Sequence, residues 1–292
     1  MASRIALGFG LALLLTSTAF AAPETKIVSY EVDGMKVVGT LVTPEGDPAP
    51  VVLLFHGFGG SRDELEIPSV GKGIFTYTAD KLAAEGIASL RIDFRNSGES
   101  DGEFPDTTYS GQIADGLAAL DFVKTLDTVD ADNIGIIGWS QGGLVASAVA
   151  GRSNVPKVTA LWAAVADPKQ TFDTLLTPEK VQAGLTTGDT PLELPMPWGF
   201  SLFLKQGYFE EIATTKPTEE IAAYKGALFV AEGTKDEAVA YGGGQLFIDA
   251  HEGDEEHFVR DMDHSFNVFT DTTTLHEMLE STLAFMKPYL GK

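Results

Sequence analysis

A serine at position 140 lies in a pattern that can form a nucleophile. The segment Gly138-Trp139-Ser140-Gln141-Gly142 matches G-x-S-x-G, follows the apolar run 134–137 and precedes a helical pattern at 144–150. This order predicts a strand, a tight turn and a helix. Such a turn projects the hydroxyl from the carboxyl end of a sheet, where the helix N-terminus favours negative charge. Ser140 is therefore the predicted nucleophile.

A second match to the same pattern, residues 98–102, centres on Ser100. The chain has 31 glycines, so about 0.2 matches are expected by chance and the pattern alone does not decide. This second segment has neither a strand directly before it nor a helix after it. We predict a loop there and no catalytic role for Ser100.

A serine hydroxyl is a weak nucleophile at neutral pH and needs a base to take its proton. Of the five histidines, His264 follows the last predicted strand, in a loop that can reach Ser140. His264 is therefore the predicted base.

The other histidines are assigned to ordinary roles: His56 to fixing the loop after the third predicted strand, His276 to a helix surface, and His251 and His257 to a solvated acidic loop. No metal-ligand spacing is present, so no metal site is predicted.

The third catalytic residue is expected beyond a strand between the serine and the histidine. Asp236 follows the predicted strand at 227–232 and can orient His264 and stabilise its charged form. Glu237 is adjacent, and Asp261 and Asp263 flank the histidine, so these three acids remain alternatives.

Attack on a carbonyl creates an oxyanion that needs hydrogen-bond donors already in place. The predicted donors are the backbone N–H groups of Gln141, after the nucleophile, and of Phe58, in a loop with glycines at 57, 59 and 60. Glycines allow close approach of the backbone to a substrate. An ordinary strand-ending turn is the alternative for this loop.

The elements around these residues alternate between strand and helix patterns. Strands are predicted at 26–32, 35–43, 50–55, 88–94, 133–139, 158–165, 227–232 and 257–262. Helices are predicted at 75–85, 109–126, 141–151, 244–251 and 274–289. The first two strands form a hairpin around Asp33-Gly34. The pattern predicts an α/β protein with a mostly parallel, doubly wound sheet of about eight strands.

Residues 167–225 interrupt this alternation. They contain six prolines and scattered aromatic residues, and are too long for a structureless loop in a compact domain. We predict an inserted cap. Pro195 and Pro197 hold the chain extended near Trp198 and Phe200, so these two aromatic side chains are the predicted substrate-binding residues of an acyl pocket.

Composition limits the partners of the chain. It has 292 residues, 44% of them apolar, no cysteine and a net charge of −22, which excludes thiol chemistry and disfavours nucleic acid and anionic membranes. Residues 1–22 resemble a secretory signal, with Arg4, an apolar run 5–15 and an A-x-A site ending at Ala21. We expect cleavage near Ala21 or Ala22, no stable membrane anchor, and a secreted or periplasmic domain at 23–292.

Several segments together resemble the cinnamoyl and feruloyl esterase branch of the alpha/beta-hydrolases, together with related carboxylesterases and acylaminopeptidase-like hydrolases. They are residues 56–60, 91–95 with 98–102, 140–143, 233–236 and 263–266. The resemblance covers most of residues 26–290. It implies an alpha/beta-hydrolase fold, a triad of Ser140, Asp236 and His264, oxyanion donors at Phe58 and Gln141, and no cofactor.

The chain departs from this branch at two points. Trp139 stands where the branch usually has histidine, and residues 237–241 lack the usual proline. The predicted activity is hydrolysis of small esters, including hydroxycinnamoyl esters, through an acyl-enzyme. Amide or peptide hydrolysis with the same triad, and an inactive binding protein on this fold, are the alternatives. The oligomeric state is not predicted.

Overall fold

A computed structural model describes residues 22–292. The predicted signal peptide at 1–22 lies outside the described residues except for Ala22. The described chain forms an eight-stranded sheet in the order β1-β2-β6-β3-β7-β8-β11-β12. The first three strands pair antiparallel and the rest pair in parallel. The predicted alpha/beta-hydrolase fold is confirmed.

The strands of this sheet are β1 (Glu24–Val32), β2 (Met35–Thr43), β3 (Ala49–Phe55), β6 (Ala88–Asp93), β7 (Val129–Trp139), β8 (Val158–Trp162), β11 (Ala227–Gly233) and β12 (Glu255–Arg260). The helices that pack on it are α1 (Ile74–Ala84), α2 (Tyr109–Val123), α3 (Gln141–Ser153), α8 (Gly243–Ala250) and α9 (Thr273–Tyr289). Short elements complete the main domain: β4 (Glu66–Ile67), β5 (Lys72–Gly73) and a 3₁₀ turn, η1 (Phe104–Asp106).

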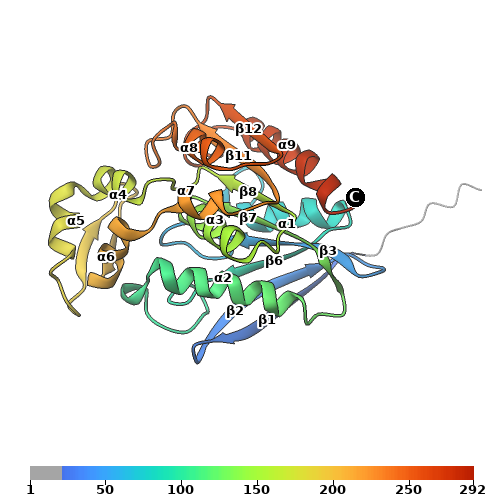
Figure 1. The fold of residues 1–292 in the computed structure, drawn as a ribbon, viewed down its shortest axis with the longest axis horizontal. Coiled ribbons are helices and arrows are strands. Elements are labelled where there is room, and N and C mark those ends of the chain that lie inside the picture. The colour runs from blue at the N-terminus through green and yellow to red at the C-terminus, as the bar shows by residue number, and fades with distance from the viewer. Residues whose placement is uncertain (1–21) are drawn as a thin grey trace, which may run out of the picture.

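Helices cover both faces of the sheet, and β3 shows how. Val51, Leu53 and Phe55 enter a core with α2, α3 and α8, whereas Val52 and Leu54 enter a second core with α1 and α9. Successive side chains of a strand point to opposite faces, so a strand buried on both faces must be apolar throughout. Figure 1 shows the sheet between these two groups of helices.

The predicted cap region contains a small subdomain. Its elements are α4 (Pro168–Leu176), α5 (Pro178–Gly184), β9 (Leu192–Pro195), β10 (Ser201–Leu204), α6 (Gln206–Thr214) and α7 (Pro217–Ala222). Helices α4, α5 and α6 lie at one end of the molecule (Figure 1). Helix α7 instead packs on α3 of the main domain. Antiparallel β9 and β10 form a hairpin that includes Trp198 and Phe200 in its turn.

Strand β8 ends at Trp162, three residues before the predicted end. The backbone of Ala163 turns to a φ of 43°, and the N–H of Val165 donates to the Ser140 carbonyl at 3.2 Å. The chain therefore leaves the sheet to pass beside the Ser140 turn. Within residues 22–292, no helix is long and apolar enough to span a bilayer.

Candidate active site

Ser140 lies at the turn between β7 and α3, in a strained backbone conformation. Its φ is 57° and its ψ is −120°, angles that cost a non-glycine residue about 1–3 kcal/mol. A Cβ at Gly138 would lie 2.2 Å from the carbonyl oxygen of Gly142, and one at Gly142 would lie 2.0 Å from that of Phe55. Gly138 therefore lets the end of β7 lie close to the start of α3, and Gly142 lets the turn fit against the end of β3.

His264 follows β12 and reaches this turn. Its Nε2 lies 3.0 Å from Ser140 Oγ, and its Nδ1 lies 2.7 Å from Asp236 Oδ2. With Nδ1 donating to the carboxylate, Nε2 is free to accept the serine proton. The Asp236 side chain is 2% exposed and that of His264 is 20% exposed. A hydrogen-bonded chain thus runs from a buried carboxylate to the serine hydroxyl.

Asp236 is fixed by its other oxygen. Oδ1 accepts the backbone N–H groups of Ala238 and Val239 at 2.9 and 2.8 Å. These bonds leave Oδ2 directed at His264.

Two of the three alternative acids have other contacts, and the third, Glu237, lines the cleft beside His264. Asp261 pairs with Lys235 at 2.8 Å. Asp263 Oδ1 accepts the N–H groups of Ser265 and Asn267, both at 2.9 Å, and so shapes the His264 loop. Among the acids considered in residues 22–292, Asp236 is the one that hydrogen-bonds His264.

Trp139 contributes a contact that the sequence did not predict. Its indole Nε1 donates to the His264 carbonyl at 3.1 Å, and the two rings lie 5.3 Å apart. The residue before the nucleophile therefore supports the loop that carries the histidine. In the sequence, Trp139 was notable only because the feruloyl esterase branch usually has histidine at this position. That difference did not indicate the contact with His264.

The two predicted oxyanion donors flank the serine. Gln141 is the first residue of α3, where an N–H has no intrahelical acceptor. Phe58 belongs to the loop after β3, and a Cβ at neighbouring Gly57 would lie 3.4 Å from Ser140 Cβ. Within the described chain, the N–H groups of Phe58 and Gln141 have no hydrogen-bond acceptor. Both can therefore donate to a ligand.

Glu64 supports the Phe58 loop from behind. Its Oε1 accepts the Gly57 N–H at 2.5 Å, and a Cβ at Gly60 would overlap its carboxyl group. Burial raises the pKa of the Glu64 carboxyl to about 8; the Gly57 hydrogen bond opposes this rise and the Asp93 carboxylate adds to it.

His56 also fixes the loop, because Nδ1 lies 2.8 Å from the Gly57 carbonyl and Nε2 accepts the Phe94 N–H at 3.2 Å.

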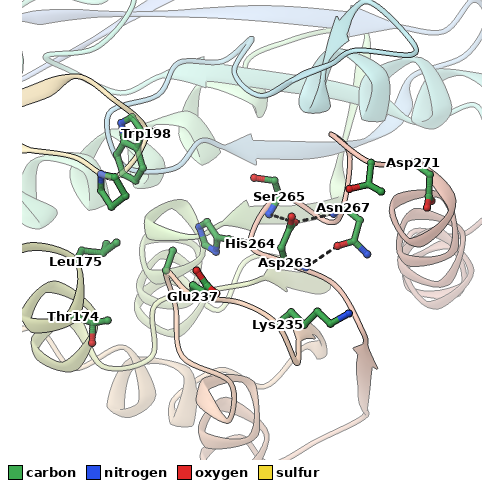
Figure 2. Close-up of a pocket in the computed structure, with 13 residues that line it drawn as sticks. Thr174, Leu175, Trp198, Lys235, Glu237, Asp263, His264, Ser265, Asn267 and Asp271 are labelled. Atoms are coloured by element: carbon green, nitrogen blue, oxygen red, sulfur yellow. Dashed lines mark hydrogen bonds between the residues drawn. The ribbon is translucent and has the colours of Figure 1, made fainter.

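A cleft of about 710 Å³ opens beside His264. Figure 2 shows Trp198 on one side of it and, apart from it, Glu237 and Lys235, which follow β11 in the chain. The residues that line it are Thr174, Leu175, Pro197, Trp198, Lys235, Glu237, Ala238, Asp263, His264, Ser265, Asn267, Thr270 and Asp271. The cleft therefore joins cap residues to the loop that carries the histidine.

The two predicted substrate-binding aromatics differ in position. Trp198 is 46% exposed and lines the cleft, whereas Phe200 is 55% exposed and is not among its lining residues. Their rings lie 6.0 Å apart at the tip of the β9–β10 hairpin. The structure brings Trp198 to the cleft with His264 and leaves Phe200 outside that cleft.

The remaining histidines have structural contacts, and the prediction of a solvated loop is wrong for two of them: the His251 side chain is buried and His257 lies in β12. His257 Nε2 lies 2.8 Å from Glu232, and His251 Nδ1 lies 2.8 Å from Glu255. His276 Nε2 lies 3.0 Å from the Tyr77 hydroxyl. No group of three or more potential metal ligands is present in residues 22–292.

Ser100 lies in a loop, as predicted, and its hydroxyl has two buried partners. It accepts the Val38 N–H at 2.8 Å and donates to the Asp93 carbonyl at 2.7 Å. The second G-x-S-x-G segment therefore joins β2 to the end of β6.

An eight-stranded α/β sheet, a serine at a strand–helix turn and an adjoining His–Asp pair together define a hydrolase-type site. Family comparison agrees: residues 50–192 match the alpha/beta hydrolase fold family. The quorum-quenching protein AidA of Acinetobacter baumannii is 30% identical over 129 residues, which cover 44% of this chain and 40% of AidA. That match therefore spans well under two-thirds of the relative.

Solved structures extend the likeness in fold to most of the chain. Est1E from Butyrivibrio proteoclasticus with bound ferulic acid superposes with a TM-score of 0.73 at 24% identity, over 91% of this chain and 100% of Est1E. The Pyrococcus furiosus esterase Pf2001 gives a TM-score of 0.67 at 20% identity, over 92% and 93%. The chain therefore has the alpha/beta-hydrolase fold, and its fold is similar to that of solved esterases.

Proposed function

We propose that this protein is a serine carboxylic-ester hydrolase that acts through an acyl-enzyme. The observation that carries the proposal is the hydrogen-bonded chain from Asp236 through His264 to Ser140 at a strained strand–helix turn. In that arrangement the base contacts the nucleophile, and a third group orients the base.

The proposed reaction has two stages. Ser140 Oγ attacks the ester carbonyl while its proton passes to His264 Nε2, and the oxyanion accepts the N–H groups of Phe58 and Gln141. His264 then gives the proton to the departing alcohol as the acyl–oxygen bond breaks, leaving an ester on Ser140. Water attacks this ester with His264 again as base, which releases the acid and restores the serine.

Small esters, including hydroxycinnamoyl (feruloyl-type) esters, are the proposed substrates. The presence of Trp198 in the cleft supports an aromatic substrate group, and ferulic acid is bound in the Est1E structure.

The signal-like pattern at 1–22 supports export, so we propose a secreted or periplasmic location. Fractionation of cells expressing the full chain tests this location, and a wholly cytoplasmic protein would contradict it.

A fluorophosphonate probe tests the proposed nucleophile. Wild type should be labelled at Ser140, and Ser140→Ala should not be labelled. Purified protein is then assayed on short acyl esters, methyl ferulate and aminoacyl amides. Faster hydrolysis of the amides than of every ester would overturn the ester assignment, and failure of the probe to label wild type would overturn the serine mechanism.

A further inference from the structure

Tyr208 connects cap helix α6 to the turn that carries the nucleophile. This tyrosine is fully buried, and its hydroxyl donates to Gln141 Oε1 at 2.5 Å. The amide nitrogen of Gln141 donates in turn to Gln112 Oε1, on α2, at 2.7 Å. The Gln141 side chain is therefore held from both ends, by the cap and by the main domain.

The ring of Tyr208 also contacts Phe58, the other proposed oxyanion residue. The two ring centroids lie 5.5 Å apart, and Phe172 of α4 packs against both rings at 5.2 and 5.3 Å. One cap side chain thus contacts the residues that carry both oxyanion donors.

Helix α6 is attached firmly to the main domain. The Glu211 carboxylate accepts the backbone N–H and the hydroxyl of Ser110, at the start of α2, at 2.9 and 2.5 Å. Lys205, which precedes α6, pairs with Asp106 at 2.6 Å. Tyr208 therefore lies on a helix that is bonded to the main domain, whereas Trp198 lies on an exposed hairpin tip.

We propose that Tyr208 is a positioning residue for the oxyanion hole, an inference that rests on the proposed esterase function. The Ser140 backbone is strained, and such a conformation persists only where the surrounding structure over-determines it. The two hydrogen bonds to the Gln141 side chain oppose relaxation of the turn, and the contact with the Tyr208 ring holds Phe58 in place. Donors must lie within about 2.7–3.1 Å of the oxyanion, so small shifts lower the rate.

Tyr208→Phe tests this role, with Tyr224→Phe as the matched control. Tyr224 is also fully buried and donates its hydroxyl to a backbone carbonyl, that of Pro156, at 3.1 Å. On 4-nitrophenyl acetate, Tyr208→Phe should lower kcat about 10- to 50-fold with little change in KM. Tyr224→Phe should lower Tm comparably but retain kcat.

A trifluoromethyl ketone inhibitor separates positioning from general destabilisation, because its hemiketal oxygen occupies the oxyanion site. Its affinity for Tyr208→Phe should fall by the same factor as kcat/KM. Gln112→Leu, which removes the other hydrogen-bond partner of the Gln141 side chain and leaves the aromatic residues unchanged, should act in the same direction. This variant also keeps the proposal testable if Tyr208→Phe does not fold.

Epistasis provides the second readout. In a Gln141→Ala background, which keeps the backbone N–H, Tyr208→Phe should cause much less further loss of kcat. Wild-type kcat in both Tyr208→Phe and Gln112→Leu, or a full further loss in the Gln141→Ala background, would overturn the proposal. Absence of ester hydrolysis by wild type would instead refute the proposed function itself.

Discussion

Ser140 and His264 are in direct contact, so the two are expected to act as one unit. Ser140→Ala and His264→Ala should each lower kcat for ester hydrolysis by at least about 10³-fold, and the double variant should be little worse than either. The hydroxyl has no other base at hydrogen-bond distance within residues 22–292. Steady-state assays of the three variants on 4-nitrophenyl acetate measure this non-additivity.

Ser100→Ala is the control for the serine assignment. It should keep wild-type kcat but lose about 1–3 kcal/mol of unfolding free energy, because the Val38 N–H and the Asp93 carbonyl lose a buried partner. Loss of activity in Ser100→Ala with retention in Ser140→Ala would reverse the assignment of the nucleophile.

Glu64 makes stability depend on pH in a defined direction. Its pKa is raised to about 8, chiefly by burial, so the folded state keeps a proton that the unfolded state has released. Unfolding free energy should therefore fall as the pH rises from about 5 to 8. Glu64→Gln, which retains the acceptor for Gly57 and cannot ionise, should flatten this decline. Urea unfolding at several pH values measures it.

The exposed neighbour Glu66 provides the comparison for Glu64. Glu66→Gln should leave the slope of stability against pH as in wild type. An unchanged slope in Glu64→Gln would show that its carboxyl does not stay protonated under the loop.

At the scale of elements, the β9–β10 hairpin places one aromatic ring in the cleft and one outside it. Trp198→Ala should lower kcat/KM for methyl ferulate by about 10- to 150-fold, because it removes the free energy gained when one large side chain is desolvated against a substrate ring. The loss on 4-nitrophenyl acetate should be far smaller. Because Trp198 is 46% exposed, Tm should change little.

Phe200→Ala is the matched control on the same turn. It removes a ring that is 55% exposed and outside the cleft, so kcat/KM for both esters should stay near wild type. Equal losses on the two esters in Trp198→Ala would refute an aromatic subsite while leaving the serine chemistry untouched.

The elements of the main domain could be predicted because each carries its own local pattern. The strand, turn and helix around Ser140 follow from an apolar run, two glycines and a helical repeat, and the structure has β7 and α3 there. Prediction of β8 ran past Trp162 because Ala163, Ala164 and Val165 remain apolar after the chain has left the sheet.

The cap could be predicted only as an insertion. Its hairpin is four residues long on each side and lacks a clear alternation, so β9 and β10 gave no usable signal. The bond between Tyr208 and Gln141 joins side chains 67 positions apart. No local pattern encodes such a contact; it follows from how α6 packs against α2 beside the start of α3.

At the scale of the whole molecule, the net charge of −22 creates a negative field that substrate and product meet differently. Under the proposed esterase function, a neutral ester enters without electrostatic cost, whereas its hydrolysis leaves an anionic carboxylate inside. The cleft adds to this field through Glu237, Asp263 and Asp271, and its Lys235 is already paired with Asp261. The field should therefore weaken binding of the acid product.

Salt should weaken the repulsion between the cleft and the acid product, because the Debye length shrinks from about 30 Å at 0.01 M to about 8 Å at 0.15 M ionic strength. The inhibition constant of ferulate should fall about three- to tenfold over that range, since screening removes repulsion. Ferulamide, the neutral analogue of the same shape, controls for the effect of salt on burial of the ring and should show little change. A ferulate inhibition constant that rises with salt would mean that the cleft attracts the carboxylate, with Lys235 as the group to replace next.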